Sequence, residues 1–302
     1  MKRLRNKNAE NIEQHIIFYT EEKWQEEKIK YNPSVAKIFS GKKNQIFVDT
    51  NEVSLNFLIG LGNEALSEND LATITSKFSN DYKEQIQPQP TKIQGDFSNK
   101  KELKNLLLGI YLGTYAIDSN KKHPVWNEDF SWIQSSLALN EFSQMLHEIF
   151  ALCEGQFTAM DWLNKPANFK KVNHMNDFLK ELAESKNLKY KNFNREECKQ
   201  LGLGAFLSVN QGSSQEASFT ILEYKSQKKD ARTIGLVGKC VLFDTGGISI
   251  KPSTNLHYMK SDMGGATAVI GTLIAAAELK LPINIVAILP ITDNAVSAQA
   301  YL

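Results

Sequence analysis

Four regular segments in the last third of the chain constrain its fold more than any other feature. Apolar patterns typical of strands occur at residues 217–224, 233–243 and 283–289. A pattern typical of a helix occurs at residues 264–279, before the last of these strands. A strand, a crossover helix and a strand in this order indicate a βαβ unit, which builds parallel sheets with a right-handed connection. We therefore predict an α/β fold with a largely parallel central sheet.

The length of the chain predicts more than one domain, because hydrophobic cores tend to divide beyond ~250 residues and this chain has 302 residues. Short apolar runs alternate with polar, helix-compatible segments over residues 1–127, which predicts a small α/β domain there. From Phe130 onward apolar residues recur at helical spacing, so we predict a linking helix over residues 128–163. The second domain is predicted over residues 164–302, where a cluster of helix-breaking residues begins.

Composition and charge argue against several classes of protein. The hydrophobic share of 42% and the charged share of 23% are those of a globular protein. The net charge of +1 gives no strong field toward nucleic acid or anionic lipid, so we expect neither partner. The longest uncharged apolar stretch, residues 263–277, is too short for a membrane span. Three cysteines without a CxxC pair, and no apolar signal segment after the basic N-terminus, predict a cytoplasmic protein.

Two aspartates occupy positions where sheets of this kind bind ligands. Asp244 follows an apolar strand and precedes Thr245-Gly246-Gly247, and Asp262 precedes Met263-Gly264-Gly265 at the start of the crossover helix. Ligands in such sheets bind beyond the carboxyl ends of the strands, and carboxylates there suit a hard or borderline divalent cation. Taken singly, each aspartate could instead be a turn residue or a helix N-cap.

Two lysines and a histidine lie near these carboxylates. Lys239, among apolar strand residues, could be a buried amine or a side chain that extends to solvent. Lys251, before Pro252, could be a plain surface charge. His257 has no HExxH or similar array around it, so the residues alone do not indicate a ligand role for it.

Three distinctive motifs lie close together in the sequence. They are Val237-Gly238-Lys239, Phe-Asp-Thr-Gly-Gly-Ile-Ser-Ile-Lys-Pro at residues 243–252, and Met-Lys-x-Asp-Met-Gly-Gly-Ala at residues 259–266. With these motifs, the whole run from residue 237 to residue 265 resembles the leucyl aminopeptidase family, peptidase family M17. The resemblance covers residues 160–302 well and the first domain only loosely. It implies a small N-terminal, macro-like α/β domain followed by a larger α/β aminopeptidase domain.

The same resemblance implies a function. Family members are cytoplasmic metallopeptidases that release N-terminal amino acids, with a leucine-type preference, from peptides, using two divalent ions, manganese or zinc. Carried over residue by residue, it makes Lys239, Asp244 and Asp262 metal ligands, Lys251 the catalytic residue, and Lys251 and Met259 substrate-binding residues. A lysine ligand must be neutral, because only the neutral amine has a lone pair. The resemblance also implies a bicarbonate base and a homohexamer.

One family feature is absent from the sequence. Family members continue into an Asp-x-Glu-Gly-Arg motif that supplies two more carboxylate ligands and an arginine for the bicarbonate base, and no such motif occurs here. Asp293-Asn294 also replaces the more usual Glu-Asn. We therefore expect a C-terminally truncated chain, with an incomplete catalytic domain and metal site. A non-catalytic binding or scaffold relative that kept the domain is the alternative.

Overall fold

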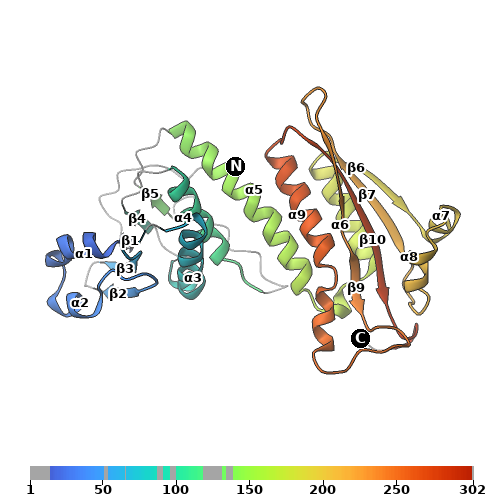
Figure 1. Ribbon diagram of the computed structural model, residues 1–302, viewed down its shortest axis with the longest axis horizontal. Helices are drawn as coiled ribbons and strands as arrows, with labels where there is room; N and C mark the ends of the chain where they lie inside the picture. Colours follow the sequence, from blue (N-terminus) through green and yellow to red (C-terminus); the bar gives the residue numbers. More distant parts are fainter. Residues whose placement is uncertain are drawn as a thin grey trace. The chain divides into compact units, whose positions relative to one another are not determined.

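The computed structural model describes residues 14–50, 54–64, 66–86, 91–95, 100–117, 131–133 and 139–300. The chain divides into two compact units, Met1–Ile149 and Phe150–Leu302. Each unit has its own five-stranded sheet (Figure 1). The division falls inside one long helix, α5 (Leu139–Asn164).

The first unit is an α/β unit built on a mixed sheet. The strand order is β2-β3-β1-β4-β5, in which β1 pairs in parallel with β3 and β4 while β2 is an antiparallel edge. The strands place large apolar side chains such as Ile16 and Phe57 in the interior. The elements are β1 (Gln14–Tyr19), α1 (Glu21–Glu27), η1 (Lys28–Lys30), α2 (Pro33–Ile38), β2 (Ile46–Thr50), β3 (Leu55–Gly60), α3 (Glu68–Ile86), β4 (Thr91–Gln94), α4 (Lys100–Gly113) and β5 (Ser131–Ile133).

The second unit contains the βαβ arrangement predicted from the sequence. Strand β10 pairs in parallel with β8 and with β9, and antiparallel with β7, which itself pairs antiparallel with β6. The α/β fold class is therefore confirmed. After α5 come η2 (Ala167–Phe169), α6 (Val172–Ser185), β6 (Lys189–Phe193), α7 (Arg195–Gln200), α8 (Gly204–Val209), β7 (Ser218–Tyr224), β8 (Thr233–Val237), β9 (Cys240–Asp244), η3 (Leu256–Ser261), α9 (Gly264–Glu278) and β10 (Asn284–Asn294).

The core of the second unit lies between the sheet, the end of α5, and helices α6 and α9. Its buried side chains include Trp162 of α5, Leu179 of α6, Leu222 of β7 and Ile270 of α9. Strand β7 alternates in burial, as a strand with two different faces should. Phe219 lies on the other face of this strand, where it contacts Phe206 of α8 instead of this core. Figure 1 accordingly shows α7 and α8 across the sheet from α6 and α9.

The strand predicted over residues 233–243 is two strands. The break comes at Gly238, which lies against the first turn of α9. A Cβ atom at Gly238 would come within 2.6 Å of Ala266 Cα, and Ala266 N donates to Lys239 O at 3.0 Å. The close approach of the helix therefore interrupts the strand and leaves Lys239 between β8 and β9.

The long helix also differs from its prediction over residues 128–163. Ser131–Ile133 form β5, in parallel register with β4, and the helix runs over Leu139–Asn164. Residues 128–130 and 134–138 lie outside the described residues. A three-residue strand is too short for its apolar pattern to be told from that of a helix, which accounts for the error. The predicted domain boundaries at 127 and 164 stay predictions.

The three cysteines, Cys153, Cys198 and Cys240, are buried and free. In the part of the chain that the structure describes, none of the helices is apolar over enough residues to cross a membrane.

Helices α5 and α9 cross at a pair of glycines, and this contact yields a stability prediction. A Cβ atom at Gly155 would lie 2.4 Å from Gly271 O. We expect Gly155→Ala to lower the free energy of unfolding by about 1–3 kcal/mol, because overpacking outweighs the better helix propensity of alanine. Urea unfolding measures the change. Gly204→Ala, where nothing lies within 4 Å of the new atom, is the control and should not destabilise; equal losses in both variants would contradict the packing argument.

Candidate active site

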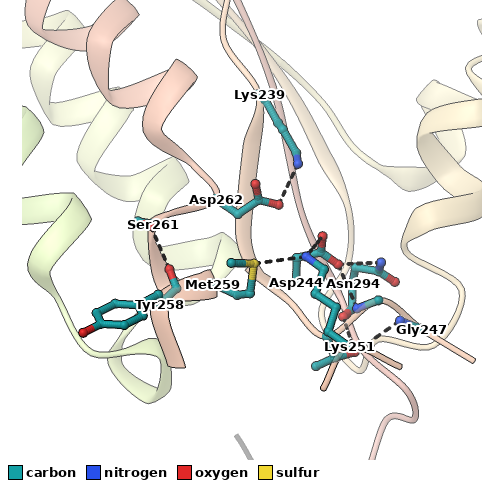
Figure 2. Close-up of polar contacts among 11 residues, drawn as sticks. Lys239, Asp244, Gly247, Lys251, Tyr258, Met259, Ser261, Asp262 and Asn294 are labelled. Atoms are coloured by element: carbon teal, nitrogen blue, oxygen red, sulfur yellow. Dashed lines mark hydrogen bonds and ion pairs between the residues drawn. The ribbon is translucent and has the colours of Figure 1, made fainter. Parts of the chain in front are cut away.

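Asp244 ends β9, at the point where the chain turns through two glycines. Gly246 and Gly247 have φ values of 90° and 72°, in the left-handed region that glycine adopts readily. Asp244 Oδ1 accepts hydrogen bonds from Gly246 N at 3.0 Å and from Asn294 Nδ2 at 2.7 Å. Its other oxygen, Oδ2, lies 2.6 Å from Lys251 Nζ (Figure 2). Asp244 therefore has the turn role that we considered, and an ion pair in addition.

The pKa of Asp244 reflects these contacts. Burial raises the pKa of this carboxyl, but the hydrogen bonds from Lys251, Gly246 and Asn294, with the charge of Lys251, outweigh burial. The pKa of Asp244 is therefore held below its ordinary value of 3.8. At neutral pH the side chain is a carboxylate, which attracts positive charge.

Lys251 is held in place at both its backbone and its amine. Its backbone N–H donates to Thr245 O at 2.9 Å and closes the loop after β9. Its Nζ contacts Asp244 Oδ2 at 2.6 Å and Met259 Sδ at 3.0 Å. An ammonium has three N–H donors, and these contacts use two of them. The side chain is 35% exposed, so the third donor can reach a bound molecule.

Lys239 and Asp262 form a second ion pair. Lys239 Nζ lies 2.6 Å from Asp262 Oδ2, and the lysine side chain is 57% exposed. Lys239 therefore extends to solvent, which is one of the two alternatives that the sequence leaves for it. The N-cap residue of α9 is Met263, without a side-chain cap. Asp262 thus does not cap the helix, and its carboxylate is directed to Lys239 (Figure 2).

The two ion pairs lie at the same end of the sheet and are linked through one short segment. The 3-10 helix η3 carries Met259, which contacts Lys251, and it ends one residue before Asp262. Figure 2 shows both pairs beside this segment. His257 instead stacks on Tyr258, with ring centroids 4.2 Å apart. The structure also adds Asn294, which the sequence does not indicate as a partner of Asp244, because β10 reaches this edge only in the folded sheet.

The side chains here match part of what a divalent cation requires. Carboxylates and a neutral amine are suitable ligands for manganese or zinc. Each of the two carboxylates is paired with a lysine amine at 2.6 Å, and only the neutral form of Lys239 could bind a cation. Within the described ranges, however, no group of three or more His, Cys, Asp or Glu side chains converges. The donors therefore fit the chemistry of the cation and fall short of the roughly four ligands that zinc usually takes.

A family model decides the identity of this region. Residues 157–302 match the model of the catalytic domain of the cytosol aminopeptidase family. This part of the chain belongs to the cytosol aminopeptidase family. The resemblance to leucyl aminopeptidases that we drew from residues 237–265 is thereby confirmed.

The curated relatives agree with the family, and the solved structures share the fold. A probable cytosol aminopeptidase of Rickettsia massiliae is 34% identical over 276 residues, which are 87% of this chain and 55% of that protein. The chain spans about half the length of the curated relatives it matches. The bottromycin maturation enzyme BotP in complex with Mn has a TM-score of 0.78 at 22% identity, over 94% of this chain and 60% of that one. The cytosol aminopeptidase from Coxiella burnetii has a TM-score of 0.75 at 19% identity, over 98% and 62%. At these identities the solved structures show a shared fold.

Proposed function

We propose that this chain carries the site of a metal-dependent aminopeptidase that hydrolyses peptides and releases N-terminal amino acids of the leucine type. The observation that carries the proposal is the Lys251 ammonium, held 2.6 Å from Asp244 at the carboxyl end of β9 within a domain of the cytosol aminopeptidase family. A fixed positive donor at this edge of an α/β sheet is suited to a developing negative charge.

The proposed roles follow from the contacts of each side chain. Lys251 donates its third N–H to the oxyanion that forms when the scissile carbonyl is attacked, and Asp244 orients that ammonium. Met259 offers an apolar surface to the substrate beside Lys251. Lys239, Asp244 and Asp262 would hold two divalent ions, which polarise a carbonyl and activate water when bound. The BotP structure with Mn supports manganese, and zinc stays open.

The test is an assay for release of a chromogenic amine from an unblocked leucine substrate and from its N-acetylated form. It is run with Mn²⁺ or Zn²⁺ on residues 1–302 and on the product of the complete gene. We expect the product of the complete gene to hydrolyse the unblocked substrate alone and to lose this activity with a chelator. Residues 1–302, which carry only part of the metal site, should be nearly inactive. Hydrolysis of both substrates alike would refute an aminopeptidase.

The non-catalytic alternative is favoured by one observation, namely that no cluster of three metal-binding side chains of the His, Cys, Asp or Glu type occurs among the described residues. Absence of activity in both proteins would favour it. A cytoplasmic location is part of our proposal, and the curated relatives are cytosol aminopeptidases. The homohexamer and the bicarbonate base stay predictions.

A further inference from the structure

Lys170 is a buried lysine that the proposed mechanism does not use. It follows η2 and precedes α6, and only 1% of the residue is exposed. Its Nζ donates to two backbone carbonyls, Leu163 O at 3.3 Å and Lys260 O, and lies 3.8 Å from Met263 Sδ. No carboxylate pairs with it among the described residues. A buried amine with no carboxylate beside it is unusual, because a charge without a counter-charge is costly to bury.

The surroundings of Lys170 show that general core packing does not account for it. Burial, together with the charges of Lys260 and Lys165, lowers the pKa of Lys170 to about 8 from 10.5, although Cys240 acts in the opposite direction. An apolar side chain of similar size would fill the same volume without this cost. The specific contribution of Lys170 is therefore its hydrogen bonds.

Those hydrogen bonds connect the last turn of α5 to η3. Leu163 O lies in the last turn of α5, where carbonyls have no partner within the helix. Lys260 belongs to η3, none of whose residues is buried, so few apolar contacts hold that segment. Lys260 Nζ adds a bond to Asn164 O at 3.2 Å. Two lysines thus join the end of α5 to η3.

The position of these contacts relative to the ion pairs leads to the inference. Lys170 contacts Lys260, two residues before Asp262, and Met263, one residue after it. We propose that Lys170 is a positioning residue, which holds η3 against the end of α5 and so places Asp262 opposite Lys239 and Met259 beside Lys251. The structural part of this inference stands alone, and its consequence for metal binding rests on the proposed function.

The first test measures local order by hydrogen–deuterium exchange in K170M, whose side chain is unbranched, one atom shorter than that of lysine, and without a donor. We expect exchange in residues 256–263 to be at least about tenfold faster, because two backbone acceptors lose their buried partner. Peptides from β7 and β10 should exchange as in the wild type. K171M is the matched control, since Lys171 is adjacent and exposed and should change nothing. Unchanged exchange in residues 256–263 would overturn the inference, as would uniformly faster exchange across the second unit.

The second test measures Mn²⁺ affinity by calorimetry. We expect K170M to bind Mn²⁺ about tenfold more weakly and K171M to bind normally, since loss of a residue that orients a ligand costs about 10–100-fold. In a D262N background, K170M should have no further effect, because it acts through Asp262. An additional tenfold loss there would contradict positioning of Asp262. If the wild type binds no Mn²⁺, the metal assignment fails, while the exchange measurement still decides the role of Lys170. Should K170M not fold, K170L, which also lacks a donor, replaces it in both measurements.

Discussion

Replacing Lys251 with alanine should lower kcat for an N-terminal leucine substrate about 100-fold or more, as removal of an oxyanion donor commonly does. The ammonium has one N–H left after its contacts with Asp244 and Met259, and the substitution removes it. Because the oxyanion exists only in the transition state, kcat and kcat/KM should fall together with little change in KM. Steady-state kinetics on the catalytically active protein measures the effect.

The control for this variant must separate catalysis from metal loss. Lys251→Ala also removes the partner of Asp244, so metal content is measured in parallel by atomic emission. Lys228→Ala, in an exposed loop, should keep full activity. Unchanged turnover with unchanged metal content would remove Lys251 from the mechanism.

Asp262→Asn should weaken Mn²⁺ binding about 100-fold or more, because loss of a residue that only orients a metal ligand already costs about 10–100-fold. The substitution keeps the size of the side chain and removes its charge. It should cost at most about 1 kcal/mol of stability, because the Lys239–Asp262 pair is partly exposed to water. Calorimetric titration with Mn²⁺ on the folded variant gives the affinity.

An exposed aspartate elsewhere in the same unit provides the comparison. Asp177→Asn, on α6, should bind Mn²⁺ as tightly as the wild type. If both asparagine variants weaken binding equally, Mn²⁺ is attracted by general surface charge, and Asp262 is not a ligand.

Much of the local structure could be predicted, because local forces dominate it. The apolar patterns at residues 217–224, 264–279 and 283–289 correspond to β7, α9 and β10 within a few residues. The glycine pair after Asp244 has the positive φ values that such a pair permits. These features depend on periodicity and backbone freedom, which the sequence displays directly.

The candidate site could be predicted only as a set of residues. Lys239, Asp244, Lys251, Met259 and Asp262 all lie in one run of the sequence, and the structure places all five at one end of the sheet. Their pairing was not foreseen. Lys251 pairs with Asp244 and Lys239 with Asp262 because the loop after β9 folds back and η3 brings Asp262 alongside.

The sequence by itself determined the class of the fold, the order of its elements and the family of its second unit. The tertiary structure alone decided the break at Gly238, the antiparallel pairing of β7, the contact of Asn294 with Asp244, and the burial of Lys170. Each of these depends on segments far apart in the chain. The closeness of Gly238 to α9, for example, is set by helix packing, and Lys170 meets Lys260 across 90 residues. Periodicity reports which face of a segment is apolar, and it carries no information about which distant segment covers that face.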